Sequence, residues 1–373
     1  MKKLIIYFGT PISHSWANNF GIFEFKKYGF DVQIWSAVEL FYSSDNIEAS
    51  KIGSYNFTLN FKNLIIIKSF DDLEAKVSKL DSNTIFWLAD RGPMENLNLD
   101  NRDLDILNKY NIRYVCQHLI PYFMPSKLLL KIRYHIRELK RRICNYKKKP
   151  YLILGTGSEG HKQIMSTFNN NLNYKSVPSL IILWSREPKQ MNEKYIVYVD
   201  EAVDHSPDAK LFGHEKACHD LKGFYARINQ VFEDIENWTG FKIIIAASNK
   251  YHYKSNPFQN RRIIYNKTQN LIQHSELVIG HKSTILWQAV VENKPLLLFY
   301  DIGLKDKKNI TIQNFSKILG INAIWTNQLT KSIFLNSNRV DVICNKKLVK
   351  KYLKEDGISG TFVENVSSAF NQI

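Results

Sequence analysis

Leu277-Val278-Ile279-Gly280-His281-Lys282-Ser283-Thr284 joins a short apolar run to a turn of glycine, basic and hydroxyl residues. The apolar run predicts a buried strand, and the pattern after the turn predicts a helix over Ile285–Glu292. Lys294-Pro295 then precedes a second apolar run, Leu296–Tyr300. Strand, turn, helix and strand in this order predict a βαβ unit of a parallel sheet. Ligands of such sheets bind outside the carboxyl ends of the strands, so the turn is the first candidate site.

The same alternation of short apolar runs with helical stretches extends over the whole chain. It predicts an α/β protein with parallel sheets. In the first half we expect strands at Leu4–Phe8, Val32–Trp35, Leu64–Ile67, Thr84–Leu88, Tyr114–Gln117, Tyr151–Leu154 and Leu180–Trp184. In the second half we expect them at Tyr195–Val199, Lys242–Ala247, Arg262–Tyr265, Leu277–Ile279, Leu296–Tyr300 and Ala323–Trp325.

A chain of 373 residues is longer than one hydrophobic core usually supports, so two domains are expected. The polar stretch Arg186–Lys194, which contains Pro188, interrupts the pattern and is the expected boundary. We therefore expect Rossmann-like domains over residues 1–190 and 191–345. A helical C-terminal segment, 346–373, is expected to pack back on the first domain.

The composition excludes a disordered chain, because 44% of the residues are hydrophobic and 13% are aromatic. The four cysteines stand far apart, which argues against a zinc site and a disulfide scaffold and favours a cytoplasmic location. No apolar run approaches the length that spans a bilayer. The net charge of +16 indicates an acidic partner: nucleic acid, anionic lipid or a phosphorylated substrate. The alternative is that the charge reflects only a composition in which Lys and Asn replace other polar residues, with no acidic partner.

One segment, Ser126–Lys149, holds ten Lys or Arg and a single acidic residue. Its apolar residues recur every three or four positions, which predicts an amphipathic basic helix. Such a helix can lie on the anionic inner leaflet of a membrane, and it can equally be a solvated surface helix. The residues that we expect to face the membrane are Lys131, Arg137, Lys140 and Arg141.

The candidate phosphate site combines the Gly280–Thr284 turn with two other loops that follow expected strands. We expect Gly280 to let the chain turn off its strand, Ser283 or Thr284 to cap the next helix, and His281 and Lys282 to add positive charge. Another helix begins at Lys267-Thr268, and we expect the two helix starts to converge on one edge of the sheet. The complete set is Ser248, Lys250, Lys267, Thr268, Gly280, His281, Lys282, Ser283 and Thr284.

A second glycine-rich turn, Gly155-Thr156-Gly157-Ser158-Glu159-Gly160, matches GxGxxG after an expected strand. This pattern is the phosphate-binding turn of dinucleotide-binding domains. No well-placed acidic residue follows at the end of the next strand, because Arg186 precedes Glu187 there. An ordinary strand-to-helix turn is therefore the favoured interpretation.

The stretch Ile243–Asp301 resembles the donor half of bacterial surface-polysaccharide glycosyltransferases of the two-Rossmann (GT-B) type. The Ser283-Thr284 turn is similar to the phosphate-binding serine motif of bacterial sialyltransferases and Kdo transferases. The His-Pro pair of those families is replaced here by Ser248-Asn249. The resemblance implies two domains facing across a cleft, 1–190 for the acceptor and 191–345 for the donor. A CMP-nonulosonate or CMP-Kdo donor is favoured and an NDP-sugar is the alternative.

The activity that the resemblance implies is transfer of a sugar to a hydroxyl of a surface glycan or glycolipid, inverting and without a metal or cofactor. A general base must then come from the acceptor domain, at the carboxyl end of a strand. Asp90 and His14 satisfy this rule, and Asp200 and Glu201 in the other domain are a third choice. The enzyme would be cytoplasmic, or peripheral at the inner membrane.

Three other functions stay open. A basic nucleic-acid-binding protein would explain the charge, but the chain has no zinc-finger, RNP or basic-zipper motif, so no nucleic acid is expected. A sugar-nucleotide epimerase would share the fold. A non-catalytic nucleotide-sugar-binding or scaffold protein would explain the missing His-Pro pair.

Overall fold

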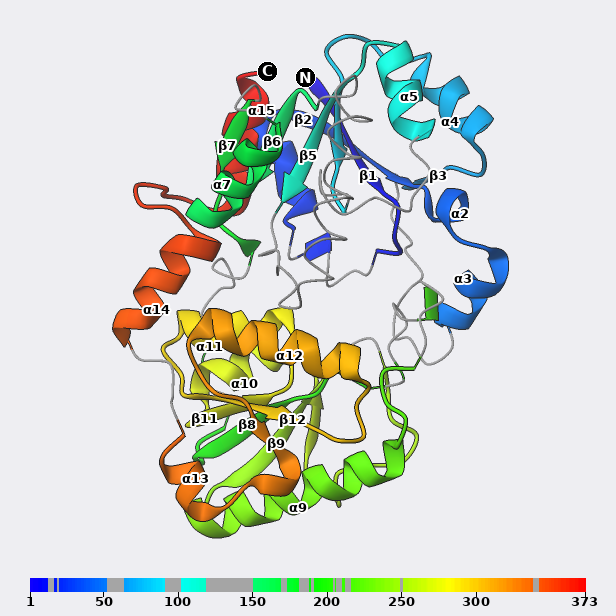
Figure 1. Ribbon diagram of the computed structural model, residues 1–373. Helices are drawn as coiled ribbons and strands as arrows, with labels where there is room; N and C mark the ends of the chain where they lie inside the picture. Colours follow the sequence, from blue (N-terminus) through cyan, green and yellow to red (C-terminus); the bar gives the residue numbers. More distant parts are fainter. Residues whose placement is uncertain are drawn as a thin grey trace. The chain divides into compact units, whose positions relative to one another are not determined.

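The chain forms two compact units, each described by itself below (Figure 1). The first unit comprises Met1–Ile47, Asn56–Leu183 and Lys350–Ile373, and the second Glu48–Tyr55 and Trp184–Val349. The C-terminal 24 residues thus belong with the N-terminal part of the chain. The computed structural model describes residues 1–12, 17–18, 20–51, 64–90, 102–118, 150–168, 173–180, 188, 191–203, 205, 210–211, 216–248, 251–337 and 342–373.

The first unit contains a seven-stranded parallel sheet in the order β3-β2-β1-β4-β5-β6-β7. Chain order reverses between β1 and β4, which makes this pair the topological switch point. The strands are β1 Lys2–Phe8, β2 Phe30–Ser36, β3 Leu64–Ile66, β4 Ile85–Leu88, β5 Arg113–His118, β6 Leu152–Gly155 and β7 Tyr174–Ser176. Its helical elements are η1 Ile22–Tyr28, α2 Val38–Phe41, α3 Ser44–Lys51, α4 Phe70–Val77, α5 Arg102–Lys109, α7 Gly157–Phe168, η5 Val349–Leu353 and α15 Phe362–Asn371, of which α3 and η5 extend across a unit boundary.

Both faces of this sheet are buried, as expected for a parallel sheet covered by helices. Along β1, Leu4, Ile6 and Phe8 enter one core cluster, and the alternate residues Ile5 and Tyr7 enter the other. Because every residue of the run is buried, the strand reads in the sequence as a continuous apolar segment.

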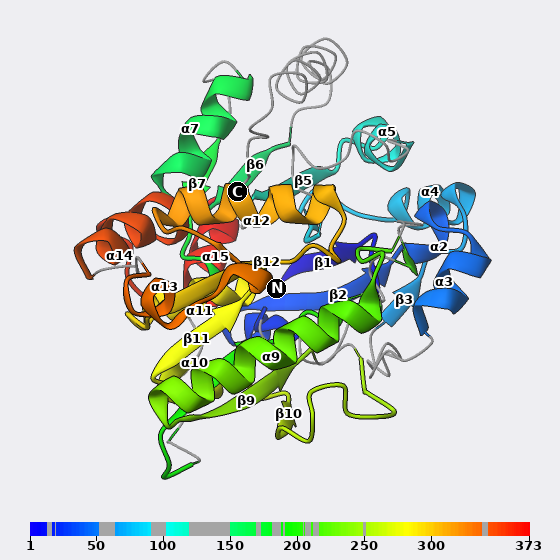
Figure 2. The same cartoon turned by 60° about the horizontal axis from the view of Figure 1, so that its bottom comes forward.

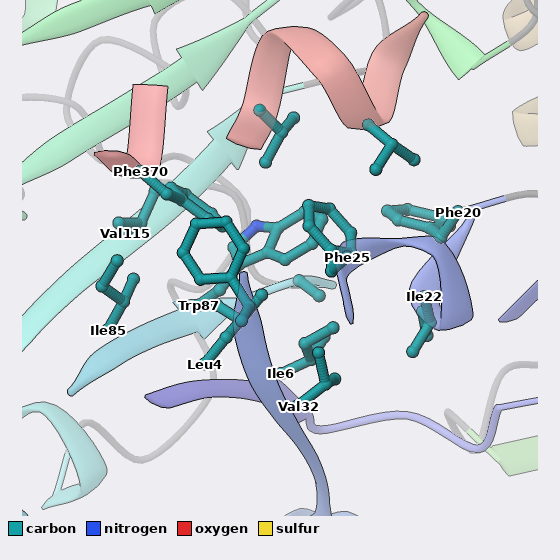
Figure 3. Packing of buried hydrophobic residues seen from close by; sticks show 14 of the residues in the cluster. Leu4, Ile6, Phe20, Ile22, Phe25, Val32, Ile85, Trp87, Val115 and Phe370 are labelled. Carbon is teal, nitrogen blue, oxygen red and sulfur yellow. The ribbon is translucent and has the colours of Figure 1, made fainter. Parts of the chain in front are cut away.

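Trp87 lies at the centre of the first of these clusters (Figure 3). Its ring centroid is 5.7 Å from that of Phe25 and 5.6 Å from that of Phe370, both in edge-on geometry. Phe370 belongs to α15, which begins with a capping box in which Thr361 and Glu364 bond each other's backbone N–H. The C-terminal helix is therefore part of the core of the first unit.

The second unit contains a six-stranded parallel sheet in the order β10-β9-β8-β11-β12-β13. Numbered within the unit, this is the Rossmann order 3-2-1-4-5-6, with its switch point between β8 and β11. The strands are β8 Tyr195–Val199, β9 Lys242–Ala247, β10 Ile263–Tyr265, β11 Leu277–Gly280, β12 Leu296–Tyr300 and β13 Ile324–Trp325. The helices are α9 Leu221–Thr239, α10 Thr268–His274, η3 Thr284–Leu286, α11 Trp287–Val291, α12 Asp306–Leu319, η4 Thr326–Gln328, α13 Lys331–Leu335 and α14 Val342–Leu348.

The longest helix, α9, lies along the sheet and contributes Phe224, Ile228 and Phe232 to the core of this unit (Figure 2). It begins at the N-cap Asp220, whose carboxylate accepts the Gly223 N–H, and ends at Gly240 in the left-handed region.

Expected and observed strands agree to within two residues at each described end, with two exceptions. The expected strand Leu180–Trp184 lies almost wholly outside the described residues, as does the expected basic helix over 126–149. Strand β7 was not expected, because its three half-buried residues include no apolar run. The single helix expected over Ile285–Glu292 is instead a 3-10 turn, η3, followed by the short helix α11.

Candidate phosphate-binding site

The candidate site lies at the carboxyl edge of the second sheet, at its switch point. Asp200 and Glu201 follow β8, and the turn His281–Thr284 follows the neighbouring strand β11. Because parallel strands end at one edge, the two loops meet, and the Lys282 N–H donates to Glu201 Oε1 over 2.5 Å. This is the place where open α/β sheets bind ligands.

The turn after β11 contains the hydroxyl groups of Ser283 and Thr284. Ser283 occupies the N-cap of η3 with an extended backbone, but its side chain makes no cap bond, contrary to the expected capping role. Neither hydroxyl has a partner among the residues that the structure describes. Gly280 also acts differently from our expectation: a Cβ there would lie 3.0 Å from the Leu286 side chain. Glycine therefore avoids a tight contact with Leu286 and does not serve a left-handed backbone angle.

His281 is a core residue, which corrects the expectation that it adds positive charge. Its side chain is fully buried, and Nδ1 lies 2.8 Å from the Phe299 carbonyl oxygen, which makes Nδ1 the protonated nitrogen. Burial lowers the pKa of His281, so the ring is neutral at pH 7. Nε2 has no hydrogen-bond partner in the described part of the chain.

Positive charge at the turn comes instead from two lysines. The Lys282 side chain is half-buried, and desolvation lowers its pKa. Lys308, in the first turn of α12, is ion-paired through Nζ with Glu201 Oε2. Sequence reasoning missed Lys308, although its position after the loop that follows β12 was a usable signal.

A buried hydrogen-bonded group lies under the loop after β8. Tyr253 donates its hydroxyl to Asp200 Oδ2 over 2.8 Å, and Oδ1 accepts the Ala202 N–H over 3.0 Å. Burial raises the pKa of Asp200 to about 6. Ala202 is held at φ +48°, a backbone conformation that side chains other than glycine and asparagine rarely adopt. Strained loops of this kind cluster at ligand sites.

The remaining predicted phosphate residues lie at the same edge, with one exception. Ser248 follows β9, and its backbone N–H bonds to the Asp200 carboxylate. Thr268 begins α10, with Lys267 at the N-cap, and α10 packs against β8, β9 and α11. The helix starts at Thr268 and at the 283–284 turn thus follow strands of one sheet edge. Lys250 lies outside the described residues.

In the first unit, Asp90 follows β4 at the corresponding switch point. Its Oδ1 accepts the Gly9 N–H over 3.0 Å, and its Oδ2 accepts the Thr10 N–H over 2.6 Å and the Thr10 hydroxyl over 2.7 Å. The carboxylate therefore connects the loop after β4 to the loop after β1. His14 and the four expected membrane-facing residues lie outside the described residues.

The GxGxxG turn is occupied by the chain itself, which excludes the dinucleotide interpretation. Gly157 has φ +63°, and a Cβ there would lie 2.4 Å from the Lys351 carbonyl oxygen. The Thr156 hydroxyl donates to the Tyr352 carbonyl over 3.1 Å. The π-helical turn η5 thus fills the place that a pyrophosphate would take. Strand β6 is also remote from the switch point of its sheet.

The described residues contain neither a metal-binding cluster nor a helix that could span a membrane. No group of three or more His, Cys, Asp or Glu side chains in them is arranged to hold a metal ion. No helix in this part of the chain is long and apolar enough to cross a membrane.

Comparison with solved structures identifies the fold. UDP-GlcNAc 2-epimerase from Methanocaldococcus jannaschii matches with a TM-score of 0.51 at 10% identity, and MurG from Acinetobacter baumannii with 0.51 at 7%, each over 100% of both chains. S. aureus MnaA, in a co-structure with UDP, matches with 0.50 at 8% identity over 100% of this chain and 98% of its own. No family model and no curated protein matches the sequence. At these identities the likeness establishes the fold alone: two Rossmann-like domains of the GT-B type, which confirms the predicted fold class.

Proposed function

We propose that the protein is a glycosyltransferase that moves a sugar from a nucleotide-activated donor to a hydroxyl of a glycan or glycolipid acceptor. The observation that carries this proposal is the Ser283–Thr284 turn, whose two hydroxyls have no partner among the described residues, at the switch point of a Rossmann-ordered sheet. Lys282 and Lys308 supply positive charge beside it. Such a donor set suits the phosphate of a nucleotide sugar, without requiring a metal.

In the proposed reaction the bond between the anomeric carbon and the donor phosphate oxygen breaks. A new bond forms from that carbon to the acceptor oxygen, the acceptor proton passes to a general base, and the nucleotide leaves as an anion. Stabilising that anion is the role proposed for the lysines and hydroxyls of the turn. The bases we propose are Asp90 and His14, acting from the opposite face of the sugar with inversion.

The donor we propose is a pyrimidine-nucleotide sugar. The similarity of the Ser283–Thr284 turn to the serine motif of sialyltransferases and Kdo transferases supports a CMP-activated nonulosonate or Kdo. The co-structure of MnaA with UDP, a protein of the same fold, supports a UDP-sugar as the second choice. The basic pattern of Ser126–Lys149 supports a peripheral contact with anionic inner-membrane lipid.

A thermal-unfolding panel with CMP, CDP, UDP, GDP, ADP and NADH tests the proposal. A ligand at about a hundred times its dissociation constant stabilises the native state by about 2.7 kcal/mol, which gives a readable increase in Tm. We expect one pyrimidine nucleotide to raise the Tm of the wild type. The double variant Ser283→Ala, Thr284→Ala should lose that increase, and Ser332→Ala, an exposed serine of α13, should keep it. Stabilisation by NADH alone, or by no nucleotide, would contradict the proposal.

A nucleotide-sugar 2-epimerase is the second candidate. One structure of the same fold is a UDP-GlcNAc 2-epimerase, and another, MnaA, was solved with UDP. The two activities differ in their need for an acceptor. NMR of the donor incubated with the protein alone distinguishes them, since an epimerase converts the sugar at C2 with the nucleotide still attached. A transferase releases the nucleotide only when the acceptor is added.

A further inference from the structure

The Glu201 carboxylate connects three loops at the carboxyl edge of the second sheet. From the loop after β8, its Oε1 accepts the Lys282 N–H of the loop after β11, and its Oε2 pairs with Lys308 after β12. The carboxylate is 12% exposed and Lys308 is 22% exposed, so solvent screens the pair only in part. A backbone N–H and an ammonium group are also the groups that donate hydrogen bonds to phosphate oxygens.

Further hydroxyl groups lie beside this pair, on the turn after β11. The residues next along the chain, Ser283 and Thr284, have hydroxyls without partners in the described part of the protein. One carboxylate, with two oxygens, therefore satisfies only part of the hydrogen-bonding capacity that is gathered at the turn.

We propose that Glu201 is a built-in substitute for the ligand phosphate, which the ligand displaces from the Lys282 N–H and from Lys308. The inference rests on the proposed nucleotide-sugar function and adds a role for Glu201 that the proposed function did not assign. Lys308 is then a phosphate-binding residue held in place by Glu201 when the site is empty. Glu201 thereby sets the specificity of the site. Only a ligand with more negative charge and more acceptor oxygens than one carboxylate can displace it.

The charge balance supports displacement over simultaneous binding. With Glu201 in place, its carboxylate balances the charges of Lys282 and Lys308. A diphosphate bound next to this carboxylate would be repelled by it. When Glu201 moves away, Lys282 and Lys308 can pair with the phosphates. The negative carboxylate and the negative phosphates are then no longer close together.

Isothermal titration of the full-length protein with inorganic pyrophosphate tests this inference, because the probe has no base or ribose that Glu201 could contact. We expect Glu201→Gln to bind pyrophosphate about tenfold more tightly than the wild type, equivalent to 1.4 kcal/mol. Lys308→Gln should bind it about tenfold more weakly. The matched control is Glu276→Gln, an exposed glutamate of the same unit that pairs with Lys194, and it should leave the affinity unchanged.

A second substitution keeps the test decisive if Glu201→Gln folds poorly. Glu201→Asp retains the charge but is one methylene shorter, so it cannot reach both Lys282 N–H and Lys308. It should bind pyrophosphate more tightly than the wild type and less tightly than Glu201→Gln. Equal or weaker binding by both Glu201 variants, with native circular dichroism, would show that Glu201 orders the turn and would overturn the inference.

Failure of this inference can be told apart from failure of the proposed function. If the wild type binds pyrophosphate, the Ser283→Ala, Thr284→Ala variant does not, and the Glu201 variants gain nothing, the phosphate site stands and Glu201 is structural. If neither the wild type nor Glu201→Gln binds pyrophosphate, the phosphate site itself is absent and both proposals fall.

Discussion

Asp200 is the carboxylate of the candidate site whose pKa is most affected by burial. Burial raises its pKa to about 6, and the bonds from Tyr253 and Ala202 lower it only in part. An acid with a raised pKa holds its proton more tightly in the native state than in the unfolded chain. Its contribution to stability is therefore complete below about pH 4 and is lost as the pH rises through about 6.

This sign predicts a difference in pH dependence between the wild type and Asp200→Asn. Between pH 4 and pH 7 the free energy of unfolding of the wild type should fall relative to that of the variant by roughly 2.4 kcal/mol. Asparagine can accept the Ala202 N–H and donate to the Tyr253 hydroxyl, so the network is retained. Urea unfolding at a series of pH values measures the difference, with the exposed Asp31→Asn as control. Parallel curves for wild type and Asp200→Asn would contradict the assignment.

At the level of elements, the turn between β6 and α7 illustrates how one local pattern can serve two purposes. Its glycines allow a backbone to approach closely, which is what a pyrophosphate requires in dinucleotide-binding proteins. Here the approaching backbone is η5 of the same chain, held by Thr156 and by the Ser179 N–H, which donates to the Leu353 carbonyl. The turn therefore anchors the C-terminal segment to the first unit.

Replacing Gly157 with alanine should destabilise the first unit. The new Cβ would lie 2.4 Å from a backbone oxygen that cannot move independently, and the residue would be forced to keep φ +63°. We expect a loss of about 2–4 kcal/mol, of which 1–2 comes from the left-handed backbone and the rest from the overlap. The control is Gly29→Ala, in the same unit with φ +85° and no atom within 4 Å of the new Cβ. Equal losses in urea unfolding would show that the contact with η5 contributes nothing.

At the level of the whole molecule, the first unit is assembled from both ends of the chain. Phe370, three residues from the C-terminus, packs against Trp87, Phe25 and Phe30 in the core of Figure 3. This arrangement makes the stability of the first unit depend on residues that the chain supplies last, whereas the second unit is built mostly from one continuous segment.

Substitution of Phe370 should therefore act on one unit only. Phe370→Ala leaves a cavity in a fully buried cluster and should lower the stability of the first unit by about 3–5 kcal/mol. Hydrogen exchange followed by mass spectrometry should show lost protection in β1 and β4 and unchanged protection in β8 and β11. Phe23 lies in the same unit and is 51% exposed, so Phe23→Ala should leave the protection of both units unchanged. Equal loss of protection in both units would contradict the division of the chain.

The sequence by itself determined the fold class and the described strands other than β7, and it pointed to the turn after β11 as the candidate site. Strands buried on both faces appear as continuous apolar runs such as Lys242–Ala247, and their alternation with helical stretches specifies parallel sheets. The site turn could be found because it follows such a run directly. These are signals between residues that are neighbours in the chain.

Only the tertiary structure decided which side chains of the site carry charge and what each one contacts. His281 is neutral and buried, Lys308 reaches Glu201 from 107 residues away, and Gly157 receives η5. Burial and partner choice depend on residues distant in the chain, so no spacing in the sequence records them. Desolvation and pairing at these distant contacts determine the pKa of each group, and with it the chemistry that the site can perform.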